Sequence, residues 1–407
     1  MVTDVSRPED ARVSRDLATL TAVSLAHWVS HVHILVLALL IPLLNKELGV
    51  GFLNLGAAIT IFSIVSGLTQ APVGFLVDKL GPRRILTAGL CLGGAAFVGL
   101  GLTLSYPALL IAAAVAGLAN SVYHPCDYAI LSAGIDEKRM GRAFSIHTFS
   151  GFLGSAMAPA MVLLAVAAVG LRAALVLMGL LGPLAAAILL LVPDAAERPA
   201  GAGKPKPAAS LGAVLSPAII VLTVFFTLLS LSTSGISNFS VSALTLAYDV
   251  SFSTANIALS GFLAAGAIGV LAGGYLADRT TRHGQVAAAC FTANALIVLI
   301  IGLAPLHPVV LVPALTLAGF LWGVIAPSRD MLVRKAAPQG AAGRAFGIVS
   351  TGFNIGGIIG PMLYGWIMDS GLPRAVFLVA AGFMVATVLL ALITDRRQAR
   401  LAAAAAQ

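Results

Sequence analysis

Charged residues are scarce in this sequence. Only 10% of the 407 residues are Asp, Glu, Lys or Arg, whereas 59% are hydrophobic, and the mean hydropathy is +1.00. A soluble globular domain carries about 25% charged residues, so this chain has too few to cover a water-facing surface. The shortage excludes an ordinary soluble protein and predicts an integral membrane protein.

Cysteine and catalytic motifs are also lacking. The three cysteines, Cys91, Cys126 and Cys290, lie in apolar stretches, so no disulfide framework is expected. The Gly-x-x-x-x-Gly-Lys-(Ser/Thr) loop of a nucleotide-driven pump is absent from the sequence. We therefore expect neither an ATP-driven pump nor an enzyme, and we expect no cofactor and no resident metal.

Long apolar stretches recur along nearly the whole chain. A membrane-spanning helix needs about 20 predominantly apolar residues, and breaks at polar residues, Gly and Pro separate the stretches. Twelve spanning helices are expected, over residues 19–44, 55–77, 85–104, 107–134, 143–168, 172–193, 215–240, 254–277, 285–304, 308–333, 345–368 and 373–394.

The lysines and arginines predict the orientation of these spans. With the N-terminus in the cytoplasm, the opposite side carries only Lys46, Arg172 and Arg374, and Arg329 lies inside a span; the other 20 of the 24 face the cytoplasm. Short loops rich in Lys and Arg stay on that side. We expect a multi-pass protein of the bacterial inner membrane with both termini cytoplasmic. Because the net charge of +8 is spread over many loops, no nucleic acid partner is expected.

The sequence repeats itself at a spacing of about half its length. The segment Gly-Phe-Leu-Val-Asp-Lys-Leu-Gly-Pro-Arg-Arg at 74–84 returns 200 residues later as Gly-Tyr-Leu-Ala-Asp-Arg at 274–279. The segment Gly-Arg-Ala-Phe-Ser-Ile at 141–146 returns 202 residues later at 343–348 as Gly-Arg-Ala-Phe-Gly-Ile. Transporters are often built from such duplicated halves.

A stretch rich in Pro, Ala, Gly and Lys separates the two copies. Its composition is that of a linker. We expect an N-terminal six-helix half at 1–193, a cytoplasmic linker at 194–214 and a C-terminal six-helix half at 215–407.

The loop at 74–84, its degraded copy, the repeat and the helix count together resemble the major facilitator superfamily. The resemblance covers the whole chain. It implies an all-α membrane protein of twelve helices in two pseudo-symmetric halves, acting as a secondary active transporter by alternating access. It also implies gating roles for the charged residues of the two loops: Asp78, Arg83, Arg84, Asp278 and Arg282.

A shorter match lies within the first half. Tyr-His-Pro at 123–125, followed by Gly-Arg-Ala at 141–143, resembles the fosmidomycin-resistance branch of efflux proteins. Cys126 stands where that branch has an acidic residue, and Asp127 follows it. The resemblance favours export over uptake.

Polar side chains inside the spans mark a candidate transport path, because each is costly unless it is paired or faces water. His27 and His31 share one helix face, and Asn120, His124 and Asp127 are spaced by four and three residues. In the superfamily, the first helix of each three-helix group lines the central cavity. The candidate coupling or solute-binding residues are His27, His31, Asn120, His124, Asp127, His147, Trp322, Arg329 and Asn354.

The four histidines allow three interpretations. Imidazole has a reference pKa near 6.5, so it can take up and release protons around neutral pH, which suits coupling to a proton gradient. His27, His31 and His124 with Asp127 are also competent transition-metal ligands. Alternatively, each imidazole bonds to a backbone or serine oxygen between helices.

Asp127 and Arg329 are separated by the repeat spacing of 202 residues. The duplication therefore predicts an acid and a base at pseudo-symmetric points. One hypothesis is a charge pair that forms and breaks during transport; another is that Arg329 holds an anionic solute while Asp127 carries a proton. A static structural pair is the third possibility.

The sequence favours a proton-coupled secondary transporter for a small polar organic solute, with efflux ahead of uptake. Two alternatives stay open, namely proton-coupled uptake of an organic anion and transport of a transition metal or metal complex. We expect a monomer whose partners are the solute, protons and the lipid bilayer.

Overall fold

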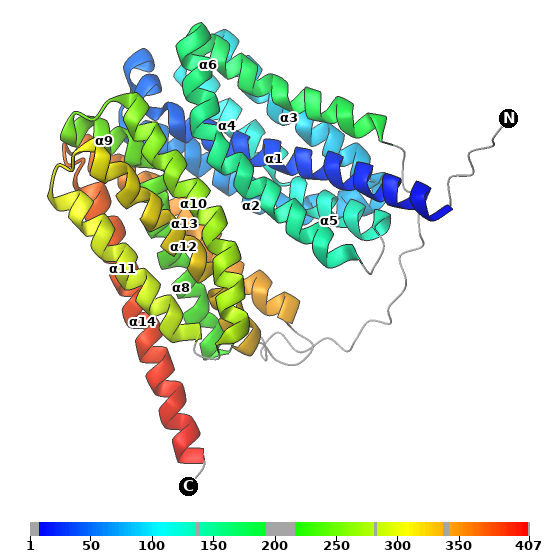
Figure 1. Ribbon diagram of the computed structural model, residues 1–407. Coiled ribbons are helices and arrows are strands. Elements are labelled where there is room, and N and C mark those ends of the chain that lie inside the picture. The colour runs from blue at the N-terminus through cyan, green and yellow to red at the C-terminus, as the bar shows by residue number, and fades with distance from the viewer. Residues whose placement is uncertain (1–7, 136–138, 193–215, 281–282, 337–341, 406–407) are drawn as a thin grey trace. The chain divides into compact units, whose positions relative to one another are not determined.

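The computed structural model describes residues 8–135, 139–192, 216–280, 283–336 and 342–405 (Figure 1). Secondary structure within these ranges is helical, without strands. The predicted all-α membrane class is confirmed. The helices are α1 (Pro8–Leu48), α2 (Phe52–Leu80), α3 (Pro82–Thr103), α4 (Tyr106–Asn120), α5 (Tyr123–Gly134), α6 (Met140–Leu191), α8 (Pro217–Ser234), the π-helix η2 (Gly235–Phe239), α9 (Ser240–Tyr248), α10 (Phe252–Arg279), α11 (His283–Leu303), α12 (Pro308–Ala336), α13 (Ala342–Asp369) and α14 (Ala375–Ala405).

Ten helical segments among the described residues are long and apolar enough to cross a membrane. One of them, Ala143–Leu191, covers two predicted spans, and its backbone leaves the helical conformation at Gly170, with φ 77° and ψ 172°. Positive φ is accessible to glycine at little cost, which explains why the two spans join there. Dividing this segment at Gly170 gives eleven spans among the described residues. The helix α13, which matches the predicted span 345–368, is the twelfth.

The predicted span 107–134 differs from the structure, because it is divided into α4 and α5 at Ser121 and Val122. Pro125 causes this break. Proline has no amide hydrogen to donate, and its ring crowds the carbonyl of the residue four positions earlier, which is Ser121. The predicted span 215–240 is also longer than expected. It runs through the π-helix η2 and on to Tyr248.

The helices form two compact units, which are described separately. One contains Met1–Val36 and Ile64–Lys204, and the other contains Leu37–Ser63 and Pro205–Gln407. The segment Leu37–Ser63 thus clusters with the second unit, although the predicted halves assign it to the first. Its contacts with α13 explain this; for example, the hydroxyl of Thr60 donates to the carbonyl of Ile358 at 2.8 Å. The predicted linker, 194–214, lies outside the described residues.

Glycines allow helices to approach closely within each unit. In the first, α3 lies along α6, and a Cβ on Gly94 would stand 2.5 Å from the carbonyl oxygen of Gly179. In the second, α10 lies along α12, and a Cβ on Gly323 would overlap the carbonyl oxygen of Gly266 (Figure 1). Helices in membranes associate through small residues of this kind. This packing fixes the helices that carry the polar side chains.

Candidate functional site

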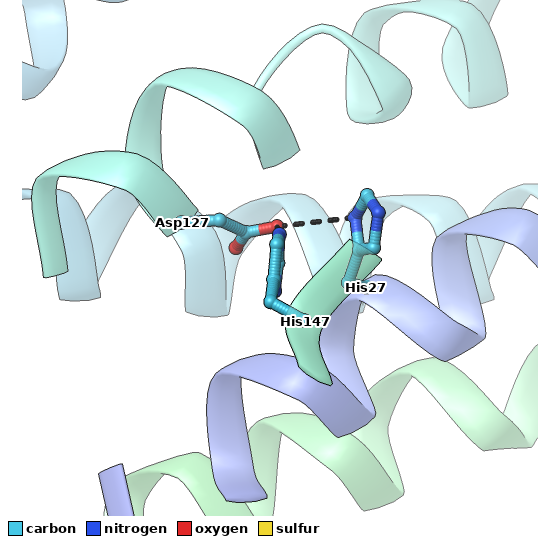
Figure 2. Close-up of side chains that lie close together, drawn as sticks. All are labelled: His27, Asp127 and His147. Atoms are coloured by element: carbon cyan, nitrogen blue, oxygen red, sulfur yellow. Dashed lines mark ion pairs between the residues drawn. The ribbon is translucent and has the colours of Figure 1, made fainter. Parts of the chain in front are cut away.

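Three helices of the first unit bring a carboxylate and two imidazoles together. Asp127 on α5 points its carboxylate towards His27 on α1 and His147 on α6 (Figure 2). Its Oδ2 lies 3.4 Å from Nδ1 of His27 and 3.5 Å from Nε2 of His147. These distances allow electrostatic pairing once an imidazole is protonated, and they are too long for strong hydrogen bonds.

This triad is buried and short of hydrogen bonds. The side chains of Asp127, His147 and His27 are 0%, 1% and 6% exposed. Both oxygens of Asp127, Nδ1 of His27 and both ring nitrogens of His147 make no hydrogen bond with the described protein atoms. An unpaired ion costs several kcal/mol in such surroundings. The carboxyl group is therefore stable when it carries a proton or faces an imidazolium.

Two further histidines extend the triad. The ring of His27 lies 4.1 Å from that of His147, 4.7 Å from that of His31 and 5.4 Å from that of His124, between centroids. Nδ1 of His31 is 2.9 Å from the hydroxyl oxygen of Ser155. His124 is exposed, whereas the triad is buried. The four rings thus run from the buried carboxyl group to an accessible edge of the unit.

The structure brings together five of the predicted residues: His27, His31, His124, Asp127 and His147. The helix break after Asn120 interrupts the predicted polar stripe of α4 and α5. The side-chain amide of Asn120 donates instead to the hydroxyl oxygen of Ser66, at 2.9 Å.

The other three predicted solute residues belong to the second unit. Trp322 on α12 packs against Phe262 of α10, with 6.0 Å between ring centroids. The guanidinium carbon of Arg329 lies 4.8 Å from the ring centroid of Phe226 and 5.1 Å from that of Phe353.

The charge of Arg329 also has an acidic partner within its own helix. Its Nε and its Nη2 each lie 2.9 Å from Oδ1 of the adjacent Asp330. Asn354, on α13, is exposed.

The predicted gating arginines lie at the start of α3. Arg83 donates to the carbonyl of Leu189 at 2.5 Å and to that of Val192, where α6 ends. A cation at the C-terminus of a helix satisfies carbonyls that have no partner inside the helix. Arg84 is exposed. Two further predicted gating residues, Asp78 in α2 and Asp278 in α10, have side chains outside the described part of the structure. Arg282, the third, lies outside the described residues altogether.

Gly151 is a site residue whose role the sequence did not reveal. A Cβ there would stand 2.6 Å from Nε2 of His27 and 2.8 Å from Nε2 of His31. The sequence could not show that histidines lie opposite this glycine.

The triad also has the composition of a metal site. Nδ1 or Nε2 of each histidine and an oxygen of Asp127 lie within 4.8 Å of one another. Imidazole and carboxylate donors suit zinc-like ions. The same three side chains are also ordinary proton donors and acceptors.

Comparison with known proteins identifies the family. The sequence model of the Major Facilitator Superfamily matches residues 23–243 and 223–407. The chain belongs to the Major Facilitator Superfamily. Members of the superfamily are transporters and not enzymes, as expected from the sequence.

Individual relatives agree with this assignment. The chain is 30% identical over 270 residues to the fosmidomycin resistance protein of Escherichia coli, a match that covers 65% of this chain and 66% of the relative. A probable L-galactonate transporter of the same bacterium is 24% identical over 139 residues, covering 34% of this chain and 31% of the relative. These matches therefore span less than two thirds of either relative.

A solved structure supports the fold. A bacterial homologue of the human lysosomal transporter Spinster, crystallised in an inward-facing and occupied conformation, aligns with a TM-score of 0.80 at 16% identity. The alignment covers 96% of this chain and 98% of the homologue. At this identity the likeness extends to the superfamily fold alone.

Replacing Gly151 by alanine tests the packing of α6 against the histidines. The added methyl group would force the rings of His27 and His31 aside, and such overpacking costs about 1–3 kcal/mol. We expect a lower midpoint of thermal unfolding for the purified protein in detergent. The matched control is Gly99→Ala in α3, where a Cβ would meet nothing within 4 Å. An equal midpoint for the two variants would contradict this packing.

Proposed function

We propose that this transporter is a proton-coupled secondary carrier that exports a small polar organic solute across the bacterial inner membrane by alternating access. One observation carries the proposal: a buried carboxyl group, Asp127, faces His27 and His147 within the membrane-spanning helices. Ionisable side chains at such depth are rare and usually serve ion or proton movement.

The triad has the chemistry that proton coupling requires. A proton on Asp127 removes the buried negative charge, and a proton on either imidazole pairs with it. An unperturbed imidazole exchanges protons near neutral pH, and the carboxylate of Asp127 opposite the rings favours its charged form. Because His124 is exposed, protons can reach the triad through the neighbouring rings.

The relatives and the residue types support the proposed direction of transport and the proposed class of solute. One relative is a fosmidomycin resistance protein of E. coli, and export of a compound would explain resistance to it. Another is a probable L-galactonate transporter, whose solute is a polar organic molecule. Imidazole, carboxyl and hydroxyl groups suit hydrogen bonding to such a solute better than contact with an apolar drug.

The proposed cycle uses the predicted halves, 1–193 and 215–407, which rock about a central path in a monomer. The gating residues are the predicted cytoplasmic charges, and both termini face the cytoplasm. Arg83 binds carbonyls at the end of α6 within its own half and so fixes the start of α3 against that helix.

Replacing Asp127 by asparagine tests the coupling. The amide keeps the shape of the carboxyl group but cannot take up a proton. In proteoliposomes, with a solute first identified by thermal shift, we expect transport driven by a pH gradient to fall at least about tenfold. Solute counterflow without a gradient should continue, because exchange does not require net proton movement.

The matched control for this test is Asp249→Asn. Asp249 is exposed and ends α9 in the left-handed conformation, with φ 53°, which asparagine tolerates. Retention of the pH-gradient response in Asp127→Asn would exclude the proton role. A thermal shift produced by Zn²⁺ and by none of the organic solutes would favour the metal alternative.

A second candidate function is uptake of an organic anion. The observation behind it is Arg329, which is 14% exposed and lies over the neighbouring rings of Phe226 and Phe353. Aromatic rings orient a guanidinium, whose remaining donors suit a carboxylate. In this case Arg329 binds the solute while Asp127, related to it by the repeat, carries the proton.

The substitution Arg329→Gln tests this alternative. If Arg329 binds the solute, the dissociation constant of an anionic solute should rise at least about tenfold, as for loss of a charge-assisted hydrogen bond. Isothermal titration of purified protein measures it. Arg374→Gln is the control, since Arg374 also lies over an aromatic ring, that of Tyr248 at 5.1 Å. Equal affinities in the two variants would remove Arg329 from the solute site.

A further inference from the structure

The first turn of α2 is bound by a carboxylate from α13. The backbone N–H of Phe52 donates to Oδ1 of Asp369 at 2.6 Å, and that of Leu53 donates to Oδ2 at 2.7 Å. The first N–H groups of a helix have no partner within the helix, and they carry its positive end. A carboxylate that accepts two of them forms a pair of charge-assisted hydrogen bonds.

The chain makes room for this carboxylate. A Cβ on Gly51, just before α2, would stand 2.7 Å from Oδ2 of Asp369. A Cβ on Gly365, one turn before Asp369, would stand 2.6 Å from the carbonyl oxygen of Phe52. Glycine at both positions lets the carboxylate and the end of α2 meet directly.

The contact continues along both helices. A Cβ on Gly56 would overlap the carbonyl oxygen of Pro361, and the hydroxyl of Thr60 donates to the carbonyl of Ile358. Ser63 lies at the far end of this contact, where its Oγ would be 3.5 Å from a Cβ on Gly357. The outer part of α2 is thus closely packed on α13 over three turns, and Asp369 binds its tip.

We propose that Asp369 is a gating residue that holds the outer end of α2 against α13 while the outer side of the path is closed. The proposal rests on the proposed alternating access, in which α2 and α13 belong to different halves and must separate when that side opens. The two hydrogen bonds then break together. The predicted cytoplasmic charges have no part in this contact, so the outer side has a restraint of its own.

The test follows the accessibility of a cysteine at the far end of the contact, in place of the half-buried Ser63. Ser63→Cys is introduced into the full chain, and its alkylation by a membrane-impermeant maleimide is measured in intact cells. Asp369→Asn keeps one acceptor but loses the charge, so we expect about tenfold faster alkylation. If Asp369 only capped α2, its loss would fray the first turn of the helix and leave the alkylation rate at position 63 unchanged. Ser63 lies eleven residues beyond Phe52 and reports on separation of the helices.

Two variants serve as comparisons. Glu47→Gln removes the same charge from an exposed position at the end of α1 and should leave the rate unchanged. Gly56→Ala should raise the rate without any change of charge, because its methyl group separates α2 from Pro361. All variants also carry Cys91→Ser and Cys290→Ser, because Cys91 is exposed and Cys290 is half-buried. The same variants without Ser63→Cys then retain only the buried Cys126, whose alkylation would reveal unfolding.

A rate in Asp369→Asn equal to that in Glu47→Gln would overturn the proposal, even if Gly56→Ala were faster. Faster alkylation accompanied by alkylation of Cys126 would also overturn it, since the variant would then have lost its fold and not its restraint. The measurement needs neither a solute nor a pH gradient. Its result is therefore independent of whether Asp127 couples transport to protons.

Discussion

The central constraint on this protein is the cost of a carboxyl group among apolar helices. Asp127 is fully buried, and its oxygens accept no hydrogen bond from the described residues. An isolated charge there is unstable by several kcal/mol, so the surroundings must supply a proton or a cation. His27 and His147 are placed to do so, at 3.4 and 3.5 Å. A neutral or paired carboxyl group is therefore more stable at this position than a bare charge.

The packing of three helices brings the members of the triad together. α1, α5 and α6 each contribute one member of the triad, and α6 comes close to α1 because Gly151 has no side chain. The break between α4 and α5, caused by Pro125, gives α5 a direction of its own. Glycine and proline therefore set the geometry, while the charged and aromatic residues supply the chemistry.

Sequence reasoning predicted the helices, the duplication and the family, because hydrophobic length, charge asymmetry and the repeated loops are local signals. It also placed His27 and His31 on one face. It could not predict that Asp127 faces His147, because that depends on how α5 packs on α6. Asp369 was missed for a different reason. An exposed acidic residue at a helix end is common, and only the fold brings it to the first turn of α2.

Infrared difference spectroscopy of the purified protein at two pH values follows the protonation of Asp127. A buried carboxyl group that gains and loses a proton produces a carbonyl band that changes with pH and shifts in D₂O. We predict that this band is present in the wild-type protein, absent in Asp127→Asn and displaced when His27 or His147 is replaced by glutamine. A spectrum without such a band, or one that Asp127→Asn leaves unchanged, would contradict it.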